Sequence, residues 1–390
     1  MFRTTVTLRA LPAMAIVAAM ALAGCADKNV PPVKATPAGN GAASGDVSTD
    51  SGPVNAVTPS KPGIENTAIA PVTAPPAGAV KDTPRVKEPT IFGELPKRSR
   101  RDSVALASMT KPDSVLDSKW PVKGPAPLPG ALLPANRIVA FYGNPLEKRM
   151  GVLGEYPKDE MLAKLDKEVS RWAKADPSHP VIPALHMVVT TAQGAPGKNG
   201  LYRLRMRDAL VDSIYGWAKS KKAIFFVDVQ LGKDNVQNEI PRLGPILANK
   251  DVHLALDPEF AMAASGAVPG RKIGTMDARE INWAIHFLDS IVKVNKLPPK
   301  ILVVHRFTRK MVSNAKDIRP TPNVQVVMDM DGWGPPWLKF DSYHDYVKAE
   351  PVQFTGFKLF FHNDTKKGDL LLTPAEVLRL TPRPLYIQYQ

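Results

Sequence analysis

The stretch VHLALDPE, residues 252–259, decides which fold this chain adopts. Four apolar residues and one histidine come first, and two acids on either side of a proline close the stretch. Alternate residues of an extended strand share a face, so both leucines lie on the same face as Val252. Ala255 lies on the opposite face with Asp257 and Glu259. The stretch therefore predicts a buried strand that packs its leucines on helices and carries two acids at its carboxyl end.

Seven further apolar runs of similar character occur in the same part of the chain. They cover residues 138–142, 181–189, 223–229, 301–305, 324–330, 356–361 and 385–389. Helical patterns separate most of them, over residues 158–174, 204–220, 236–248, 277–296 and 337–348. Continuous apolar strands that alternate with helices are typical of a parallel sheet covered by helices. Eight such units in about 250 residues predict a (β/α)8 TIM-like barrel of the α/β class.

The alternative α/β architecture is an open, doubly wound sheet. Its Gly-rich dinucleotide turn is missing, and GAPGK at residues 194–198 is not a phosphate loop, because a proline replaces a backbone donor.

The helix over residues 277–296 starts with Asp277-Ala-Arg-Glu280, which has the form of a capping box. Because the eighth strand lies at the end of the chain, we expect part of residues 100–135 to replace the outer helix after it.

The first 25 residues have the pattern of an export signal. Residues 1–9 carry two arginines, and the apolar run of residues 10–21 is shorter than the roughly 20 residues that span a bilayer. Leu22-Ala23-Gly24-Cys25 resembles the lipobox of bacterial lipoproteins. The resemblance implies cleavage before Cys25 and lipidation of its sulfur, so that acyl chains anchor the protein. We therefore expect a cell-envelope protein, lipid-anchored on the extracytoplasmic or periplasmic side of a bacterial membrane.

Composition divides the chain into three parts. Residues 1–24 are the predicted lipoprotein signal peptide, residues 25–130 a Pro/Ala/Gly-rich tether, and residues 131–390 the barrel. The chain has 39 prolines and 26 glycines, above the usual share, and the tether has no sustained apolar period, so we expect the tether to be disordered. The single cysteine excludes a disulfide framework and a cysteine-type zinc or iron–sulfur site.

The strand-face argument places polar side chains near the carboxyl end of every predicted strand. In chain order they are Tyr142, His186, Asp228 with Gln230, Asp257 with Glu259, His305, Asp329 with Asp331, Lys358 and Gln388. Barrels build their sites at this end, and a buried charge is costly unless it is paired or used. A structural network in which Lys358 and His305 neutralise two acids is the alternative. Because the acids outnumber these cations, the ring indicates chemistry or ligand binding.

Carboxyl groups in the mouth of a barrel suit the hydrolysis of glycosidic bonds. One protonates the leaving oxygen while another acts as nucleophile or activates water. We expect Glu259 to be the general acid and Asp257 to orient it. Either Asp228 or Asp331 then supplies the second carboxyl group. The expected substrate-binding side chains are Tyr142, His186, Gln230, His305, Asp329, Trp333, Lys358 and Gln388, with Trp333 stacking on a sugar unless it packs in the core.

Asp257-Pro258-Glu259 resembles the Asp-x-Glu that ends the fourth strand in chitinase-like and lysozyme-like glycosidase barrels. The likeness covers three residues, and Leu254 and Ala255 stand where the full chitinase pattern has further acids. Barrels of the large retaining clan carry a nucleophilic glutamate on the seventh strand, where this chain has Lys358. That departure argues against the mechanism of the retaining clan.

A wider resemblance covers residues 137–390. FYGNPL at residues 141–146, MGVLGEY at residues 150–156 and LALDPE at residues 254–259 are similar to stretches of a family of secreted bacterial barrel proteins. No activity is established for that family. The resemblance therefore implies a barrel and export, but no reaction.

Two other functions fit the same residues. One is a barrel that binds glycan without cleaving it, for which Lys358 in place of a carboxylate is equally suitable. The other is a divalent-metal hydrolase, whose candidate ligands are Asp228, Asp257, Glu259, His305 and Asp331. The first strand has no His-x-His and the chain has no His-Glu-x-x-His, so we expect neither a metal nor another cofactor.

Charge restricts the expected partners. The chain has 51 Lys and Arg against 37 Asp and Glu, a formal net charge of +14. A basic protein favours acidic surroundings, and peptidoglycan or a surface polysaccharide is the natural substrate of an anchored envelope protein. The cations are scattered and no nucleic-acid-reading motif accompanies them, so we expect no nucleic-acid partner. We expect a monomer whose second partner is the lipid bilayer, through Cys25.

Overall fold

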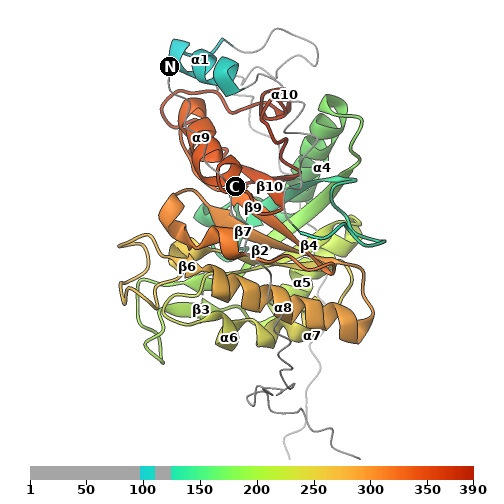
Figure 1. Ribbon diagram of the computed structural model, residues 1–390, viewed down its shortest axis with the longest axis vertical. Coiled ribbons are helices and arrows are strands. Elements are labelled where there is room, and N and C mark those ends of the chain that lie inside the picture. Colours follow the sequence, from blue (N-terminus) through green and yellow to red (C-terminus); the bar gives the residue numbers. More distant parts are fainter. Residues whose placement is uncertain (1–96, 110–123) are drawn as a thin grey trace, which may run out of the picture. The chain divides into compact units, whose positions relative to one another are not determined.

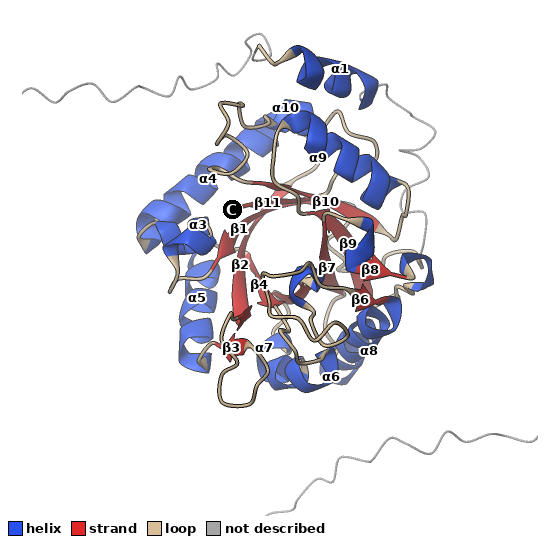
Figure 2. Ribbon diagram, turned by 90° about the vertical axis from the view of Figure 1, so that its left-hand side faces the viewer, coloured by secondary structure: helices blue, strands red, loops and turns tan. Residues whose placement is uncertain are grey.

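The computed structural model describes residues 97–109 and 124–390, which contain a closed barrel of parallel strands (Figure 2). In chain order the strands are β1 (Arg137–Gly143), β2 (Val181–Ala192), β4 (Ile224–Val229), β5 (Val252–Leu256), β7 (Lys300–Arg306), β9 (Val324–Met330), β10 (Phe354–Leu359) and β11 (Tyr386–Tyr389). Each strand pairs with the next, and β1 pairs with both β2 and β11, which closes the ring. The predicted (β/α)8 barrel is confirmed, and the open doubly wound sheet is excluded.

Helices cover the outside of the barrel (Figure 1). They are α1 (Arg100–Met109), α3 (Val152–Glu155), α4 (Lys158–Ala175), α5 (Asp208–Ser220), α6 (Val236–Glu239), α7 (Gly244–Leu247), α8 (Ala278–Asn295), α9 (Pro336–Ser342), α10 (Pro374–Val377) and the π-helix η6 (Tyr343–Lys348). The 3-10 turns are η1 (Lys148–Met150), η2 (Pro241–Leu243), η3 (Pro258–Phe260), η4 (Arg309–Met311) and η5 (Ala315–Asp317). Two short strands, β6 (Met276–Asp277) and β8 (Val312–Ser313), pair with each other apart from the barrel.

Two of the predicted helices are wrong in their bounds. The helix expected from residue 204 begins at Asp208, because β3 (Arg203–Arg205) pairs antiparallel with the end of β2. The helix expected over residues 236–248 is divided into α6, η2 and α7. Pro241 has no backbone N–H to donate inside a continuous helix, so the chain forms short turns instead.

The start of α8 matches its prediction. The Asp277 side chain accepts the backbone N–H of Arg279, and the Glu280 side chain accepts the backbone N–H of Asp277 at 3.0 Å. These reciprocal bonds form the expected capping box and satisfy donors that a helix start leaves unpaired. Ile281 and Ile285 are buried on the same face of α8, as its apolar spacing requires.

Hydrophobic side chains form two clusters, one on each face of the barrel wall. Leu254 and Leu256 belong to the larger cluster, which includes residues of the strands and of the outer helices. Ala255 belongs to the smaller cluster with Phe226 and Val303. The two faces of β5 are therefore those that strict alternation predicted, with the leucines outward and Ala255 toward the axis.

The segment before β1 closes the amino end of the barrel. Leu133 is buried in the axial cluster, and its backbone N–H and C=O bond to the Gln325 side chain at 3.1 and 2.6 Å. Lys300, at the start of β7, donates from Nζ to the Val252 carbonyl at 2.8 Å. The polar ring predicted from the sequence lies at the opposite, carboxyl end of the strands.

The helix α1 packs against α9 and does not take the place of an outer helix after β11. The Arg101 guanidinium lies 3.4 Å from the centroid of the Trp337 ring, and Asp102 accepts the Trp337 backbone N–H at 3.0 Å. Arg98 pairs with Glu376 of α10 at 2.6 Å. Residues 100–109 therefore cover a helix that is already present, and residues 110–123 of the expected segment lie outside the described residues.

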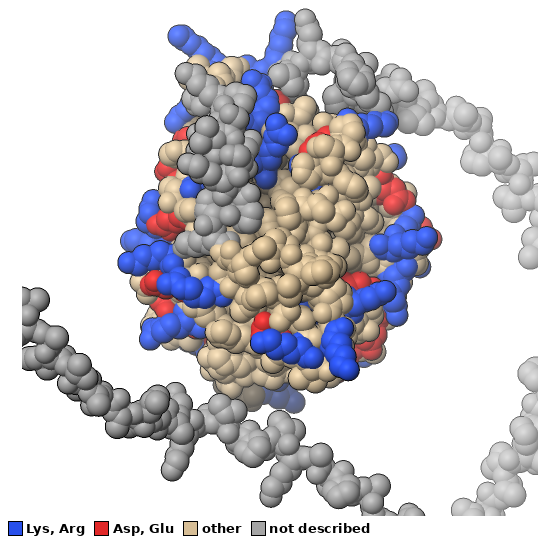
Figure 3. Space-filling model, turned by 45° about the vertical axis from the view of Figure 1, so that its right-hand side comes forward, with Lys and Arg blue, Asp and Glu red and all other residues tan. Residues whose placement is uncertain are grey.

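On the surface, charges of both signs are mixed. Figure 3 shows one face on which Lys and Arg lie around the margin, with Asp and Glu among them and other residues in the centre. Basic residues are thus interspersed with acidic ones on the part of this face that the described residues form. Within residues 97–109 and 124–390, no helix combines the length and the apolar character that a bilayer crossing requires.

Candidate functional site

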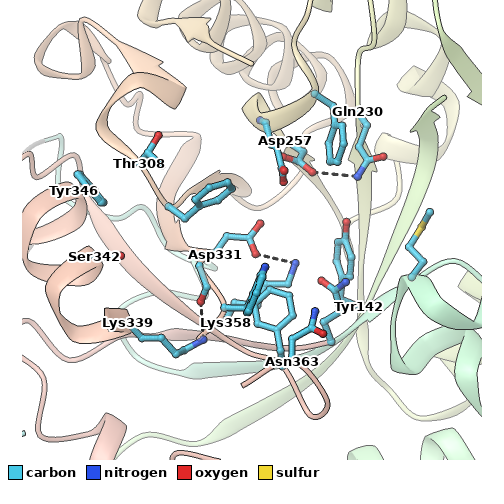
Figure 4. Close-up of a pocket in the computed structure, with 18 of the residues that line it drawn as sticks. Tyr142, Gln230, Asp257, Thr308, Asp331, Lys339, Ser342, Tyr346, Lys358 and Asn363 are labelled. Atoms are coloured by element: carbon cyan, nitrogen blue, oxygen red, sulfur yellow. Dashed lines mark hydrogen bonds and ion pairs between the residues drawn. The ribbon is translucent and has the colours of Figure 1, made fainter. Parts of the chain in front are cut away.

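A cavity of about 630 Å³ lies at the carboxyl end of the barrel (Figure 4). Its wall includes three acids and two lysines: Asp257, Glu259, Asp331, Lys339 and Lys358. Six aromatic rings also line it: Tyr142, Phe260, Phe307, Trp333, Tyr346 and Phe360. Aromatic walls with a few convergent charged groups are typical of small-molecule sites, and this is the end at which barrels carry them.

The predicted site residues lie at two depths. Seven line the cavity: Tyr142, Gln230, Asp257, Glu259, Asp331, Trp333 and Lys358. Five have no exposed surface and lie deeper inside the barrel: His186, Asp228, His305, Asp329 and Gln388. Asp257, Glu259 and Asp331 are termed the cavity acids, and His186, Asp228, His305 and Asp329 are termed the buried cluster. The predicted lipidation site, Cys25, lies outside the described residues.

Asp257 and Glu259 are joined by the turn between them. Asp257 caps η3, its Oδ1 accepting the backbone N–H of Glu259 at 3.1 Å, while its Oδ2 accepts from Gln230 Nε2 at 3.1 Å (Figure 4). Burial raises the pKa of Glu259 to about 7, with a further rise from Asp331. Burial also raises the pKa of Asp257 well above its ordinary value. Both carboxyl groups therefore favour the protonated form more than an exposed acid does.

Asp331 has the opposite environment. Its Oδ1 pairs with Lys358 Nζ at 3.0 Å, and its Oδ2 lies 3.2 Å from His305 Nδ1 (Figure 4). Burial alone would raise the pKa of Asp331, but Lys358 and His305 together lower it below its ordinary value. Lys358 is itself fixed over the Tyr142 ring, with Nζ 3.8 Å from the ring centroid. The cavity thus holds one carboxylate that stays ionised, Asp331, and two carboxyl groups, Asp257 and Glu259, whose protonated form is favoured.

The loop that carries Trp333 is held from both sides. Lys339 Nζ donates to the Gly332 carbonyl at 2.7 Å and pairs with Asp364 at 2.9 Å. Asp364 in turn accepts the backbone N–H of Gly334 at 2.9 Å. Trp333 itself remains 54% exposed at the cavity wall, so it does not pack in the core. A fixed loop with an exposed indole is suited to stacking on a flat or ring-shaped ligand.

The buried cluster converges on one carboxylate. Asp228 Oδ2 lies 3.0 Å from His186 Nε2 and 3.2 Å from His305 Nε2. His305 Nδ1 lies 3.3 Å from Asp329 Oδ2. Gly356 on β10 leaves the room that the Asp329 carboxylate occupies, because a Cβ atom there would collide with Asp329 Oδ1. Three donor atoms, one each from His186, Asp228 and His305, lie within 4.8 Å of one another and form the one such metal-ligand group among the described residues.

Protonation differs between the two histidines of the buried cluster. Burial lowers the pKa of His186 to about 4. Burial would lower the pKa of His305 as well, but the carboxylates of Asp331, Asp228 and Asp329 raise it well above its ordinary value. Burial opposes ionisation of Asp228, yet His305 and His186 hold its pKa well below the usual range. His305 is therefore the cation among the acids of the buried cluster.

Several wall residues were missed by the sequence analysis. Phe307, Phe360 and Gln390 lie two positions beyond His305, Lys358 and Gln388, so continuing the strand alternation past each strand end would have found them. Lys339 and Tyr346 lie on α9 and η6, where no strand pattern applies. Their position in the wall depends on how these helices pack over the strand ends.

No known protein-family model matches the chain, and a search of curated proteins finds no similar sequence. The cavity acids, the aromatic wall and the buried cluster are therefore the basis for assigning a function.

Proposed function

We propose that this protein is a membrane-anchored, extracytoplasmic glycoside hydrolase-like enzyme that acts on a cell-wall or surface polysaccharide by carboxylate acid/base chemistry. The observation that carries the proposal is the divergence of two carboxyl groups in one cavity. The pKa of Glu259 is raised to about 7, whereas Lys358 and His305 lower the pKa of Asp331. Acids whose environments push their pKa values apart are suited to the two roles of glycoside hydrolysis.

In the proposed reaction Glu259 gives its proton to the glycosidic oxygen as the bond to the anomeric carbon breaks. Asp331 either forms a covalent bond to that carbon, later replaced by water, or takes the proton of a water that attacks it directly. The leaving sugar departs with the proton from Glu259, and water supplies the hydroxyl group on the anomeric carbon in both cases. The proton of that water passes to the Glu259 carboxylate in the covalent route. It passes to Asp331 in the direct route, after which solvent restores the proton on Glu259. Asp257 acts as a positioning residue, because its carboxyl group holds the turn that carries Glu259.

The cavity wall offers groups that suit a sugar polymer. Trp333 and Phe260 supply aromatic faces, and Gln230 and Lys358 supply donors for hydroxyl or acidic groups. The net charge of +14 favours a negatively charged polymer. Peptidoglycan or an acidic surface polysaccharide is therefore the proposed substrate class.

The proposed place of action follows from the first residues of the chain. Leu22-Ala23-Gly24-Cys25 resembles a lipobox, and residues 25–130 have the composition of a long flexible tether. Acyl chains on Cys25 would hold the barrel at the outer side of a bacterial membrane, and the tether would let it reach nearby polymer.

One observation favours a second function, a barrel that binds glycan without cleaving it. Both oxygens of Asp331 are engaged, Oδ1 by Lys358 and Oδ2 by His305. A carboxylate held by two cations is a weaker nucleophile and a weaker base. Lys358 would then serve as a binding group for an acidic sugar.

Release of reducing ends from polysaccharides by the purified full-length protein tests the proposal. The panel contains peptidoglycan, chitin-type, glucan and uronic-acid polymers, each with and without a chelator. We expect release from at least one polymer, and we expect Glu259→Gln and Asp331→Asn each to reduce it by about 100-fold or more. Glu160→Gln, an exposed change on α4, is the matched control and should leave release unchanged.

Binding of the same polymers separates the two functions. If no polymer is cleaved and Glu259→Gln binds as well as the unaltered protein, the catalytic proposal is wrong and the glycan-binding barrel is supported. Release that the chelator abolishes would instead support the divalent-metal hydrolase.

A further inference from the structure

Three side chains from different strands meet inside the barrel, deeper than the cavity. His186 on β2, Asp228 on β4 and His305 on β7 direct Nε2, Oδ2 and Nε2 toward one another inside the barrel. We propose that His186, Asp228 and His305 bind a divalent transition-metal ion of the zinc class, through Nε2 of each histidine and Oδ2 of Asp228. The inference does not depend on the proposed function, because the ion site does not include the cavity acids.

The spacing of the donor atoms suits such an ion. A zinc ion at roughly 2.0–2.1 Å from each ligand atom places tetrahedral ligand atoms roughly 3.3 Å apart. The two histidine nitrogens lie 3.0 and 3.2 Å from Asp228 Oδ2, within a few tenths of an ångström of that spacing. The two nitrogens lie no more than 4.8 Å from each other. Small shifts of buried side chains would therefore complete the coordination.

The outer nitrogen of each histidine lies near polar groups of the kind that metal-bound histidines contact, and His305 Nδ1 does so at ion-pair distance without a well-aligned hydrogen bond. A ligating imidazole holds the metal with one nitrogen and donates from the other to a carboxylate or another oxygen. His305 Nδ1 lies 3.2 and 3.3 Å from the carboxylates of Asp331 and Asp329. His186 Nδ1 lies 2.6 Å from the Tyr386 hydroxyl and 3.1 Å from the Gln388 amide.

Unpartnered oxygen atoms point to a missing cation. Among the described residues, Asp228 Oδ1 and both oxygens of Asp329 are buried with no hydrogen bond of acceptable geometry. Gln388 Oε1 is also unpartnered, and turning the amide over would present it to His186 Nδ1 as an acceptor. Buried charge without a partner is costly. A divalent ion on the Asp228 carboxylate would supply the positive charge that the unpartnered Asp228 Oδ1 lacks.

The ligand types select the class of ion. Two imidazole nitrogens and one carboxylate suit Zn²⁺ and its transition-metal neighbours, whereas Mg²⁺ and Ca²⁺ prefer oxygen ligands alone.

The ring of Tyr142 has its centroid 5.3 Å from that of His186 and 6.0 Å from that of His305, and Tyr142 also lines the cavity. The ion would thus be separated from a cavity ligand by Tyr142 and would tie together β2, β4 and β7.

Zinc titration of tag-free, full-length protein that has been stripped with a chelator tests this inference without any polysaccharide. We expect one equivalent of Zn²⁺ to bind and to raise the thermal midpoint of unfolding. His305→Gln and Asp228→Asn should each weaken binding by about 100-fold or more, since both remove a direct ligand. His253→Gln is the matched control, because His253 is also a buried histidine on an inward position but bonds to Ile301.

The unaltered protein supplies a second readout in case the variants do not fold. Bound Co²⁺ should give the intense visible absorption of a four-coordinate site with nitrogen and oxygen ligands. Less than about one tenth of an equivalent of Zn²⁺ bound, or the weak absorption of six-coordinate Co²⁺, would overturn the inference. Equal zinc affinity in the unaltered protein and in folded His305→Gln would overturn it as well. Because no substrate is present, these outcomes are independent of whether the protein cleaves a polysaccharide.

Discussion

Asp329 and Asp331 are two residues apart at the end of β9 and face the same side of the barrel wall. They differ in solvent exposure and in the groups that their carboxylates contact. Asp331 lines the cavity and pairs with Lys358. Asp329 has no exposed surface, and neither of its oxygens has a well-aligned hydrogen bond. Two residues of a strand advance only about 6.6 Å. This short step divides the polar ring into cavity acids that can contact a molecule in the cavity and a buried cluster that cannot.

The comparison shows that carboxyl groups are suited to different chemical roles at the two depths. In the cavity, Glu259 has a pKa of about 7 and is suited to proton transfer. In the buried cluster, Asp228 is held ionised between two histidines, which suits ion pairing or metal binding. Removing a cavity acid should therefore impair activity, and removing a member of the buried cluster should impair stability.

The largest expected effect lies in the buried cluster. Asp228→Ala should lower the free energy of unfolding by about 3–5 kcal/mol, because it leaves a buried partner, His305, without one of its carboxylates. Urea denaturation in the presence of a chelator measures the change. Glu259→Gln, on a half-buried residue of similar volume, should change the same quantity by less than about 1 kcal/mol. Equal losses of unfolding free energy in the two variants would show that the cavity acids and the buried cluster do not differ in their contribution to stability.

A smaller effect is expected on the pH dependence of activity. The groups that act on Glu259 are Asp331, Lys358 and His305, and Asp257 is adjacent. A general acid must be protonated, so kcat/KM should fall as the pH rises through about 7, the pKa of Glu259. Lys358 lowers this pKa, and Lys358→Met should therefore move the alkaline limb upward by about one pH unit.

The control for that prediction is Lys174→Met, on an exposed lysine of α4. It should leave the alkaline limb in place. A limb that does not move in Lys358→Met, or that moves equally in both variants, would show that the limb belongs to a group other than Glu259.

The smallest expected effect concerns Trp333, which is exposed at the cavity wall. Trp333→Ala should weaken glycan binding by about 5- to 10-fold through the loss of a stacking face. The free energy of unfolding should stay within about 0.5 kcal/mol, since the ring packs little against the protein. Binding isotherms for the polymer measure the first quantity. Leu146→Ala, a change of another exposed apolar residue that lies outside the cavity wall, should alter neither, and equal weakening in both variants would contradict a stacking role.

Local signals in the sequence predicted most of the fold. The alternation in VHLALDPE placed Leu254 and Leu256 on the outer face and Ala255 on the inner one, as observed. The Asp277–Glu280 capping box was also predictable, because both partners lie within one turn. The start of α5 was not, because β3 forms only by pairing with β2, which is distant in the sequence.

By itself the sequence determined which residues face the barrel axis, because strand alternation is a property of neighbouring residues. Only the tertiary structure decided their depth and their partners. Depth depends on the register between strands, which pairs His305 with Asp329 across β7 and β9 and sets Lys358 beside Gln388 across β10 and β11. Closing the barrel then brings His186 and His305 onto Asp228, although 119 residues separate the two histidines. The distance between these side chains cannot be predicted from their spacing in the sequence, because closure of the barrel brings together strands that are far apart along the chain.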